Sequence, residues 1–461
     1  MKLTRRQVLG GAAAGALGAA GVYELVDRLA SSPERPATAA HPPEQHVLDG
    51  VRVVEDGGVE VLVPPLHHEV VTAKVAVDGR DLRDAQRALE DSLRGLDKRY
   101  QASPAGLGVT VAWGLPYFET HVADAWRRNE PRDRRAERAA LLPTRRFPSD
   151  PAETVLEEND VAILLRSDAR EHIEDAAQTL FEQVGAFRVT SIRKGFAGGG
   201  FDGGSSLPKR LAMAAGVPGA DLIPDRAELF LGFTSTQRTG LGPRKIVNFE
   251  TLGLVDVGEG YFREGTHMHL SHIHEQLDTW YQLFDFRDRV DTTFRPGLTV
   301  APGTLTVRQA QDDISAAADV AHDFDRGRTI GHSAALQTAS RLHADHVAED
   351  GVVYPAGTAI PHRADFNTLD NPFFWSAAPE RDGMRDGPAA GVHFVVFNPS
   401  SDDFERIRFA MDGVLPDGTK LEFEPGRGRQ GFNSVLRTTH RQNFLVPPRR
   451  HRSFPLAEIP V

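Results

Sequence analysis

Runs of apolar residues with strand and helix spacing follow one another in a regular order in the first part of the chain. Strands are predicted by HHEVVTAKVAV from His67, which alternates apolar and polar positions, and by GVTVAWGL from Gly108 and DVAILLRS from Asp160. Helices are predicted over 82–96 and by EHIEDAAQTLFEQV from Glu171, where apolar residues recur at helical spacing. The pattern therefore predicts the order strand, helix, strand, strand, helix, strand.

A comparable set of runs returns later in the chain. Strand-like runs are HMHLSHIH from His267 and GVHFVVFNP from Gly391, and the helical runs that follow them are EQLDTWYQLF and SDDFERIRFAMDG. The repeated order is that of a ferredoxin-like unit. We therefore predict an α+β protein of two ferredoxin-like halves, 47–235 and 236–455, with antiparallel sheets and peripheral helices. The polar stretch 300–390, rich in turn signals, is predicted to form long loops.

The N-terminus has the parts of an export signal. Lys2, Arg5 and Arg6 are followed by a weakly apolar stretch rich in Gly and Ala, and Ala37-Thr38-Ala39 is a small-residue cleavage motif. TRRQVL resembles the twin-arginine consensus, which implies export of the folded protein by the twin-arginine translocase. We expect residues 1–39 to be this signal peptide and the protein to be periplasmic or extracellular. An ordinary signal peptide with two chance arginines is the alternative.

Composition limits the chemistry further. About 420 residues follow the signal, which is enough for a buried cofactor pocket. The formal charge of -11 argues against a nucleic-acid partner, because binding phosphates needs a basic surface. The chain has no cysteine and 18 histidines, so a metal or haem would be held by His, carboxylate, Tyr or Met.

Several stretches, in their order along the chain, resemble the dye-decolourising peroxidase family of haem proteins. These stretches are WGLPYFE at Trp113, DVAILLRSDAREHIEDAAQTL at Asp160, ELFLGFTS at Glu228, GTHMHLSHIHEQLDTWY at Gly265 and GVHFVVFNPSSDDFERIR at Gly391. The resemblance implies ferredoxin-like halves of the dimeric α+β barrel type, with haem b bound mainly in the C-terminal half. It places Phe394 where the family has an aromatic residue over the haem.

A haem peroxidase needs an axial ligand for its iron, and imidazole is the natural choice where cysteine is absent. The stretch TIGHSAALQTASR resembles the segment around the family's proximal histidine, which implies that His332 ligates the iron. His343 and His346 stay open as alternatives, because they stand nearer to Arg363 along the chain. A loop histidine that bonds only backbone and solvent is the structural alternative.

On the opposite face of the iron, peroxide needs a fixed positive charge. The stretch IPHRADFNTLD resembles the arginine-bearing segment near the family's haem, which implies that Arg363 stabilises negative charge there or binds a haem propionate. A guanidinium stays charged in any protein environment and donates several hydrogen bonds. An ion pair with Asp365 or Asp370 is the structural alternative.

The acid group of the family is missing at its usual place. Ser235 stands where the family's Gly-x-x-Asp-Gly motif has Asp, and a hydroxyl cannot act as an acid or base near neutral pH without help. A literal match, GGFDG, contains Asp202 but lies earlier, in a glycine-rich loop. We interpret it as a chance match in a sequence with 43 glycines.

The histidine run is a competing candidate for a metal site. His267 and His269 share one face of the expected strand, while His272 and His274 share the other, so the four side chains cannot meet. A half-polar strand is the simpler interpretation, and His393 is expected in the core.

The sequence thus predicts an exported haem peroxidase that reduces hydrogen peroxide and oxidises small organic donors. Trp280, Tyr281 and Trp375 are candidates for electron relay or for core packing. Because of Ser235, a haem-binding or iron-handling protein of the same fold with weakened turnover is the alternative. A non-haem metal-binding module is a third hypothesis, and a homo-oligomer is compatible with the sequence.

Overall fold

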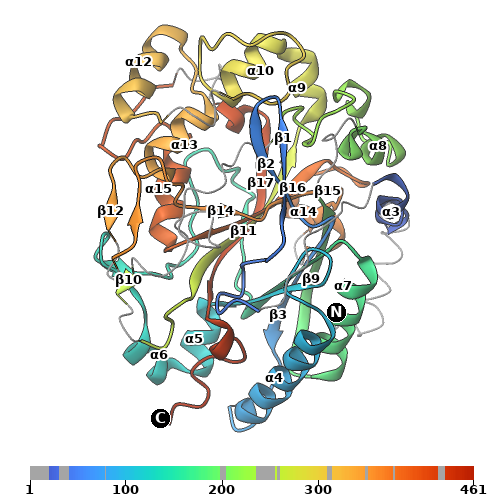
Figure 1. Cartoon of the computed structure of the whole chain (residues 1–461), viewed down its shortest axis with the longest axis vertical. Coiled ribbons are helices and arrows are strands. Elements are labelled where there is room, and N and C mark those ends of the chain that lie inside the picture. The colour runs from blue at the N-terminus through green and yellow to red at the C-terminus, as the bar shows by residue number, and fades with distance from the viewer. Residues whose placement is uncertain are drawn as a thin grey trace.

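The main feature of the molecule is a barrel of antiparallel strands that is covered by helices (Figure 1). The computed structural model describes residues 20–30, 41–77, 79–197, 204–234, 255–256, 260–308, 314–347, 351–376, 379–423 and 431–460. The predicted boundary between the halves, at residues 235 and 236, lies outside these ranges.

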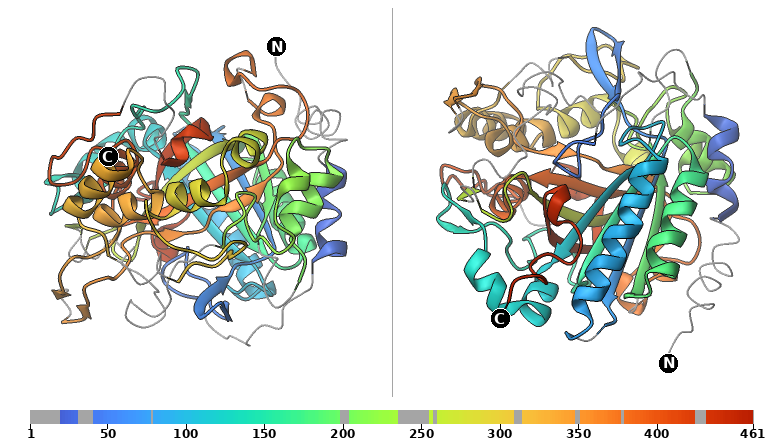
Figure 2. Two further views of the ribbon diagram at one scale, coloured as in Figure 1. Left: turned by 90° about the horizontal axis from the view of Figure 1, so that it is seen from above. Right: turned by 60° about the horizontal axis from the view of Figure 1, so that its bottom comes forward.

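The N-terminal half forms a four-stranded sheet with helices on its outer face (Figure 2). Its elements are β3 (His67–Val75), α4 (Leu82–Arg99), β4 (Gly108–Gly114), β8 (Val161–Ser167), α7 (Arg170–Ala177), a π-helical continuation at Gln178–Gln183, and β9 (Phe187–Phe196). The strand order β9-β3-β8-β4 places the first and third strands in the centre, as in a ferredoxin-like unit. Leu89, Leu93 and Leu96 of α4 recur at helical spacing and are buried against the sheet.

The C-terminal half repeats this topology. Its elements are β11 (Thr266–Glu275), the broken strand β14 (His362–Arg363) and β15 (Phe366–Thr368), β16 (Gly391–Asn398), α15 (Ser401–Met411) and β17 (Leu436–Val446). β11 pairs with both β16 and β17, and β15 pairs with the other edge of β16. The α+β class and the two ferredoxin-like halves are therefore confirmed.

The two sheets join edge to edge and close the barrel. β17 pairs with β4 at Phe444–Gly114 and Leu445–Trp113, and β15 pairs with β9 at Asn367–Phe196. Inward side chains from both halves form one apolar cluster, whose members include Val70, Ala162, Leu164, Met268, Leu270, Val395, Phe397 and Phe444. Because successive side chains on a strand alternate, their neighbours point outward toward the covering helices.

The connection from β11 to β14 is long and helical, in contrast to the prediction of loops over 300–390. It contains α9 (Leu277–Leu283), α10 (Phe286–Thr293), α12 (Ala317–Gly327) and α13 (His332–Ser340), followed by the hairpin β12 (His346–Val347) and β13 (Val353–Tyr354). α13 consists largely of small residues, so its sequence shows no apolar stripe. Ala334 and Ala335 bury it in a cluster with Ala410 of α15.

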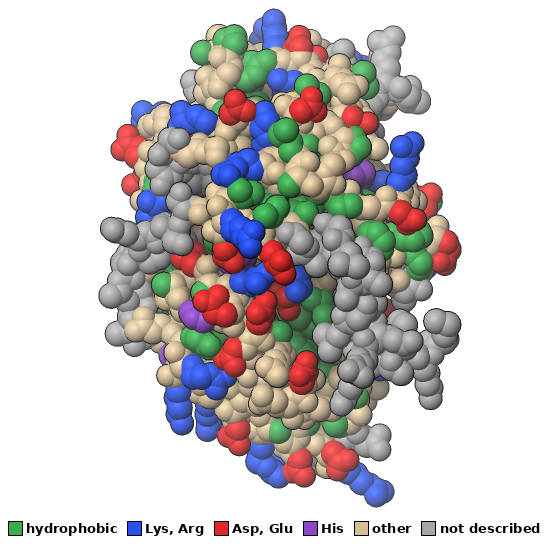
Figure 3. Space-filling model, turned by 90° about the vertical axis from the view of Figure 1, so that its right-hand side faces the viewer, with side chains coloured by type: hydrophobic (Ala, Val, Ile, Leu, Met, Phe, Trp, Pro, Cys, Tyr) green, Lys and Arg blue, Asp and Glu red, His purple; other side chains and the backbone are tan. Residues whose placement is uncertain are grey.

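Smaller elements surround the barrel. They are α2 (Ala20–Tyr23), α3 (Val26–Leu29), the hairpin β1 (Arg52–Asp56) and β2 (Val59–Val63), α5 (Leu115–His121), α6 (Ala123–Asn129), α8 (Leu207–Ala214) and α14 (Pro379–Asp382). In the described ranges, no helix has the length and hydrophobicity that crossing a bilayer requires. On the face in Figure 3, acidic and basic side chains are interspersed, without a large field of either sign.

Candidate functional site

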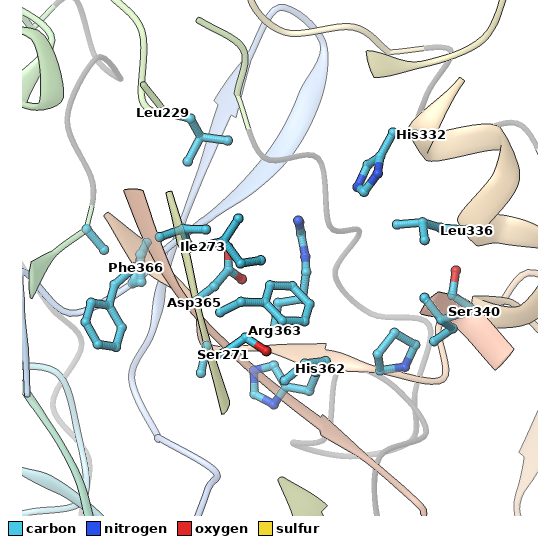
Figure 4. Close-up of a pocket in the computed structure, with 18 of the residues that line it drawn as sticks. Leu229, Ser271, Ile273, His332, Leu336, Ser340, His362, Arg363, Asp365 and Phe366 are labelled. Atoms are coloured by element: carbon cyan, nitrogen blue, oxygen red, sulfur yellow. The ribbon is translucent and has the colours of Figure 1, made fainter. Parts of the chain in front are cut away.

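A cavity of about 640 Å³ lies on the outer face of the C-terminal sheet, beneath α13 and α15. Strand residues that line it include Ser271, Ile273 and Glu275 of β11 and Val392, Phe394 and Val396 of β16; Leu336, Phe404 and Met411 line it from the helices. The segment Leu229–Thr234 contributes another wall (Figure 4). The size is that of a pocket for a ligand of cofactor or drug size.

His332 is the first residue of α13 and points into this cavity (Figure 4). Its Nδ1 is buried and, among the described residues, has no hydrogen-bond partner, while its ring packs on Phe432 with 4.5 Å between the centroids. Burial, together with the smaller effect of the positive charges of Arg363 and Arg408, lowers the pKa of His332 to about 3. The imidazole is therefore neutral at neutral pH, which is the form that ligates a metal.

Arg363 and Asp365 line the cavity from the strand side, opposite His332 (Figure 4). They lie on either side of Ala364, which belongs to the apolar cluster inside the barrel. Because side chains alternate, Arg363 and Asp365 both face outward into the cavity. In Figure 4 the guanidinium of Arg363 extends toward His332 across the cavity. A neutral imidazole on one wall thus faces a cation and a carboxyl group on the other.

Glu275, at the end of β11, adds a second carboxyl group to the cavity. Its side chain is buried, and its Oε2 has no hydrogen-bond partner among the described residues. Burial, together with the smaller effect of the negative charge of Asp365, raises the pKa of Glu275 to about 8. Glu275 is therefore largely protonated at neutral pH and can donate a hydrogen bond to a ligand.

From the sequence, Asp365 was considered only as an ion-pair partner of Arg363, and Glu275 was assigned no role. The sequence signal for Asp365 was its position two residues after Arg363, because residues i and i+2 of a strand lie on the same face. The family's acid position, Ser235, and the chance match at Asp202 both lie outside the described residues. Phe394 lines the cavity, as expected of a residue packing on a ligand there.

The two rival ligands of the iron lie elsewhere. His343 is exposed, and its Nε2 lies 3.3 Å from the carbonyl oxygen of Thr338. His346 belongs to the β12–β13 hairpin. Neither lines the cavity, whereas His332 does. The role of His332 as iron ligand stays a prediction.

The histidine run of β11 is part of the packed core. The ring of His269 stacks on Phe404 with 3.5 Å between the centroids and contacts Asn443 and Ser271 through its two nitrogens. His272 faces the barrel interior, where its ring lies beside that of His393. Among the residues that the structure describes, no three His, Asp or Glu side chains are grouped to hold a metal ion.

The aromatic residues proposed as relays have structural contacts. The Nε1 of Trp280 donates to the carbonyl oxygen of Leu231, and the hydroxyl of Tyr281 donates to that of Phe230. Both bonds fix the wall of the cavity that runs from Leu229 to Thr234. Trp375 lies away from this wall, between His440 and the guanidinium of Arg193.

Comparisons with known proteins agree with this architecture. A sequence profile of a family described as "Family of unknown function (DUF7405)" matches residues 65–448. No curated protein matches the chain in sequence.

Two solved structures illustrate the likeness in fold. A crystal structure from Shewanella oneidensis, of a protein assigned to the dyp-type peroxidases, matches with a TM-score of 0.51 and 11% identity, covering 86% of this chain and 96% of its own. The DyP-type peroxidase from Cellulomonas bogoriensis matches with a TM-score of 0.51 and 17% identity, covering 88% and 96%. The chain therefore has the DyP-type fold, as the resemblance implied, with a highly diverged sequence.

Proposed function

The chain belongs to the DUF7405 family, whose function is unknown, and we propose that it is an exported haem-dependent peroxidase that reduces hydrogen peroxide and oxidises organic donors. The observation that carries the proposal is the cavity in a DyP-type fold, where a neutral imidazole faces an arginine and a carboxyl group. Each of these groups has a defined task in peroxide reduction.

The lining of the cavity fits haem b. Phe394 and Leu336 offer apolar surface to a porphyrin, and Arg341 at the same cavity carries the positive charge that a propionate requires. The Nδ1 of His332 is buried and has no hydrogen-bond partner among the described residues. Burying a polar atom without a partner is costly, and such an atom is usually explained by a bound group. His332 would hold the iron, and Arg363 and Asp365 lie across the cavity from His332. Haem b, when bound, supplies an iron that passes electrons from organic donors to peroxide.

The protein side chains handle charge and protons. Overall, hydrogen peroxide takes up two electrons from donors and two protons and yields two molecules of water. Arg363 donates hydrogen bonds to the oxygen on which negative charge develops as the O–O bond breaks. Asp365, on the same face, accepts a proton from one peroxide oxygen and returns it to the other, which leaves as water. Asp365 thereby takes the task for which Ser235 is unsuited.

The haem assignment is tested by absorption spectroscopy of protein purified after haem supplementation. We expect a Soret band in the wild type and in His343→Ala, which changes an exposed histidine, and a lost or strongly weakened band in His332→Ala. A wild-type protein without a Soret band would contradict haem binding. An unchanged spectrum in His332→Ala would contradict this residue as the ligand.

Peroxide-dependent oxidation of a dye then tests the enzymatic part. We expect turnover by the haem-loaded wild type and much slower turnover by Arg363→Ala with its Soret band retained. A haem-loaded protein without turnover would instead indicate the alternative of a haem-binding or iron-handling protein. The absence of a three-residue metal group among the described residues gives no support to the non-haem metal module.

A further inference from the structure

The chain segment Ala20–Ala30, which lies within the expected signal peptide, packs against the folded body. Val22, Tyr23 and Val26 are 4%, 7% and 0% exposed. They belong to one apolar cluster with Leu66 at the start of the barrel and Leu211 of α8. Figures 1 and 2 show α3 beside α8 at the side of the molecule. Three buried side chains within five residues are the pattern of a packed segment rather than of a free leader.

The hydroxyl of Tyr23 fixes the segment to the end of β15. It accepts a hydrogen bond from the backbone nitrogen of Leu369 at 2.9 Å, and it lies 3.0 Å from Oδ1 of Asp370 and 3.0 Å from the carbonyl oxygen of Lys194. Asp370 is itself half-buried, and its Oδ2 accepts from the backbone nitrogen of Lys194 at 2.5 Å. Loss of Tyr23 would leave these buried polar groups with fewer partners, which is costly.

Two further contacts hold the segment beyond Val26. Oδ1 of Asp27 lies 2.6 Å from Nε2 of His67, the first residue of β3. Beyond it, a guanidinium nitrogen of Arg210 donates to the carbonyl oxygen of Leu29 at 3.0 Å. The segment thus contacts β3, β9, the end of β15 and α8, and none of these contacts involves the candidate active site.

We propose that docking of Ala20–Ala30 on the body keeps this segment in the exported protein, so that the chain is not cut at Ala37–Ala39. Cutting at that motif and losing the leader would expose the surface on which Val22 and Val26 pack and strip Asp370 and His67 of partners. The exported chain would then also keep the residues that precede the segment. The proposal does not depend on the haem assignment.

Intact mass of the exported protein tests the proposal directly. A C-terminally tagged full chain is produced in a host with a twin-arginine translocase and purified from the exported fraction only. We expect a mass that includes residues 20–30. A chain that begins at residue 40 would overturn the proposal.

A matched pair of variants tests whether docking is the cause. Tyr23→Ala with Val26→Asp removes buried contacts, whereas Glu24→Ala with Arg28→Ala changes exposed side chains of the same segment. We expect the first double variant to be exported in the cut form and the second to keep its N-terminus. An uncut exported form of Tyr23→Ala with Val26→Asp would overturn the proposal, because the segment would then stay without docking.

Protein purified from the cytoplasm gives a second measurement that does not depend on export. A site for a specific protease replaces residues 33–37, and the folded protein is cut there. We expect the N-terminal fragment to coelute with the body on size exclusion in the wild-type background and with Glu24→Ala and Arg28→Ala, and to separate with Tyr23→Ala and Val26→Asp. A wild-type fragment that separates from the body under native conditions would overturn the proposal.

Discussion

Asp365 and Glu275 place two carboxyl groups with different tasks in one cavity. Glu275 is buried, and that burial keeps it largely protonated at neutral pH, so it can donate a hydrogen bond there. Asp365 is half-buried and shares the cavity face of Arg363. Asp365 is therefore the group we expect to move a proton.

The task of Asp365 predicts the effect of Asp365→Asn. The amide keeps the shape of the side chain but cannot accept the peroxide proton, so we expect dye oxidation to slow by about 10²- to 10⁴-fold. Because Asp365 does not ligate iron in this proposal, the Soret band should be unchanged. Turnover equal to the wild type would contradict the acid–base role, whereas loss of the Soret band would mean that Asp365 is needed for haem binding.

The raised pKa of Glu275 predicts a pH dependence of stability. Between the ordinary value of 4.5 and about 8, the folded protein holds a proton that the unfolded chain has released. The free energy of unfolding must therefore fall as pH rises through this window, by at most about 1.4 kcal/mol per pH unit from this group. In Glu275→Gln that contribution is absent, so the variant should gain stability relative to the wild type from pH 5 to pH 8.

Urea unfolding at pH 5, 6.5 and 8 measures this difference. Glu119→Gln, an exposed position, is the control and should stay parallel to the wild type. If Glu275→Gln also stays parallel, Glu275 does not carry a raised pKa in the folded protein.

At the scale of single residues, the sequence identified fewer residues of the candidate site than the structure does. His332, Arg363 and Phe394 were found through a family resemblance, and all three line the cavity. Asp365 and Glu275 were missed because a carboxyl group two residues after an arginine, or at a strand end, is usually an ion-pair partner or solvated. The position of the cavity, together with the strand face that they share with its other lining residues, identifies these two.

Among the elements, α13 determines where His332 lies. The helix begins directly after Gly331, whose backbone approaches that of Phe294 and Arg295 closely. A Cβ at Gly331 would lie 2.4 Å from the carbonyl oxygen of Phe294. Glycine is required there because no side chain can share that space.

Gly331→Ala therefore tests the placement of His332. The methyl group must push the start of α13 away from Phe294, so we expect a loss of more than about 1 kcal/mol in unfolding free energy and weaker haem binding. Gly95→Ala is the matched control, because a Cβ in the middle of α4 would meet only a guanidinium nitrogen of Arg99 at 3.8 Å. That control should stabilise the protein by ~0.5–1 kcal/mol. Equal stability and haem titration in Gly331→Ala and wild type would contradict this account.

Helices with a regular repeat of apolar residues were predicted with nearly correct bounds, whereas helices without such a repeat were not predicted. The stretch from Leu82 carries a regular leucine stripe and is a helix over Leu82–Arg99. α13 has the sequence HSAALQTAS, in which no stripe stands out, and its burial depends on close approach to α15. The segment Val22–Val26 directly follows the Gly- and Ala-rich stretch that is typical of a signal peptide, so only its contacts reveal a packed segment.

At the scale of the whole molecule, the two halves of the barrel contribute differently to the cavity. The two halves share a topology, but the connection from β11 to β14 has grown to include α9, α10, α12 and α13. The matching connection in the N-terminal half, from β3 to β4, contains only α4. The long connection supplies one wall of the cavity, so the asymmetry of the halves is what creates the candidate site.

Export of the folded barrel makes its own prediction. Twin-arginine recognition depends on both arginines, so replacing Arg5 and Arg6 by Lys should leave the protein inside the cell while its spectrum and stability stay unchanged. Cell fractionation followed by immunoblotting measures the distribution. Unchanged export of the double lysine variant would indicate the ordinary signal peptide instead.

The two short joins between the halves have a consequence for synthesis on the ribosome. β4 and β9 are the edge strands of the N-terminal sheet. Their outer edges pair with β17 and β15 of the C-terminal half, and β17 ends at Val446. A nascent chain therefore carries open sheet edges until β17 has been synthesised, and such edges readily pair with other chains. Chaperone protection in that interval, more than the stability of the finished barrel, should limit the yield of the protein.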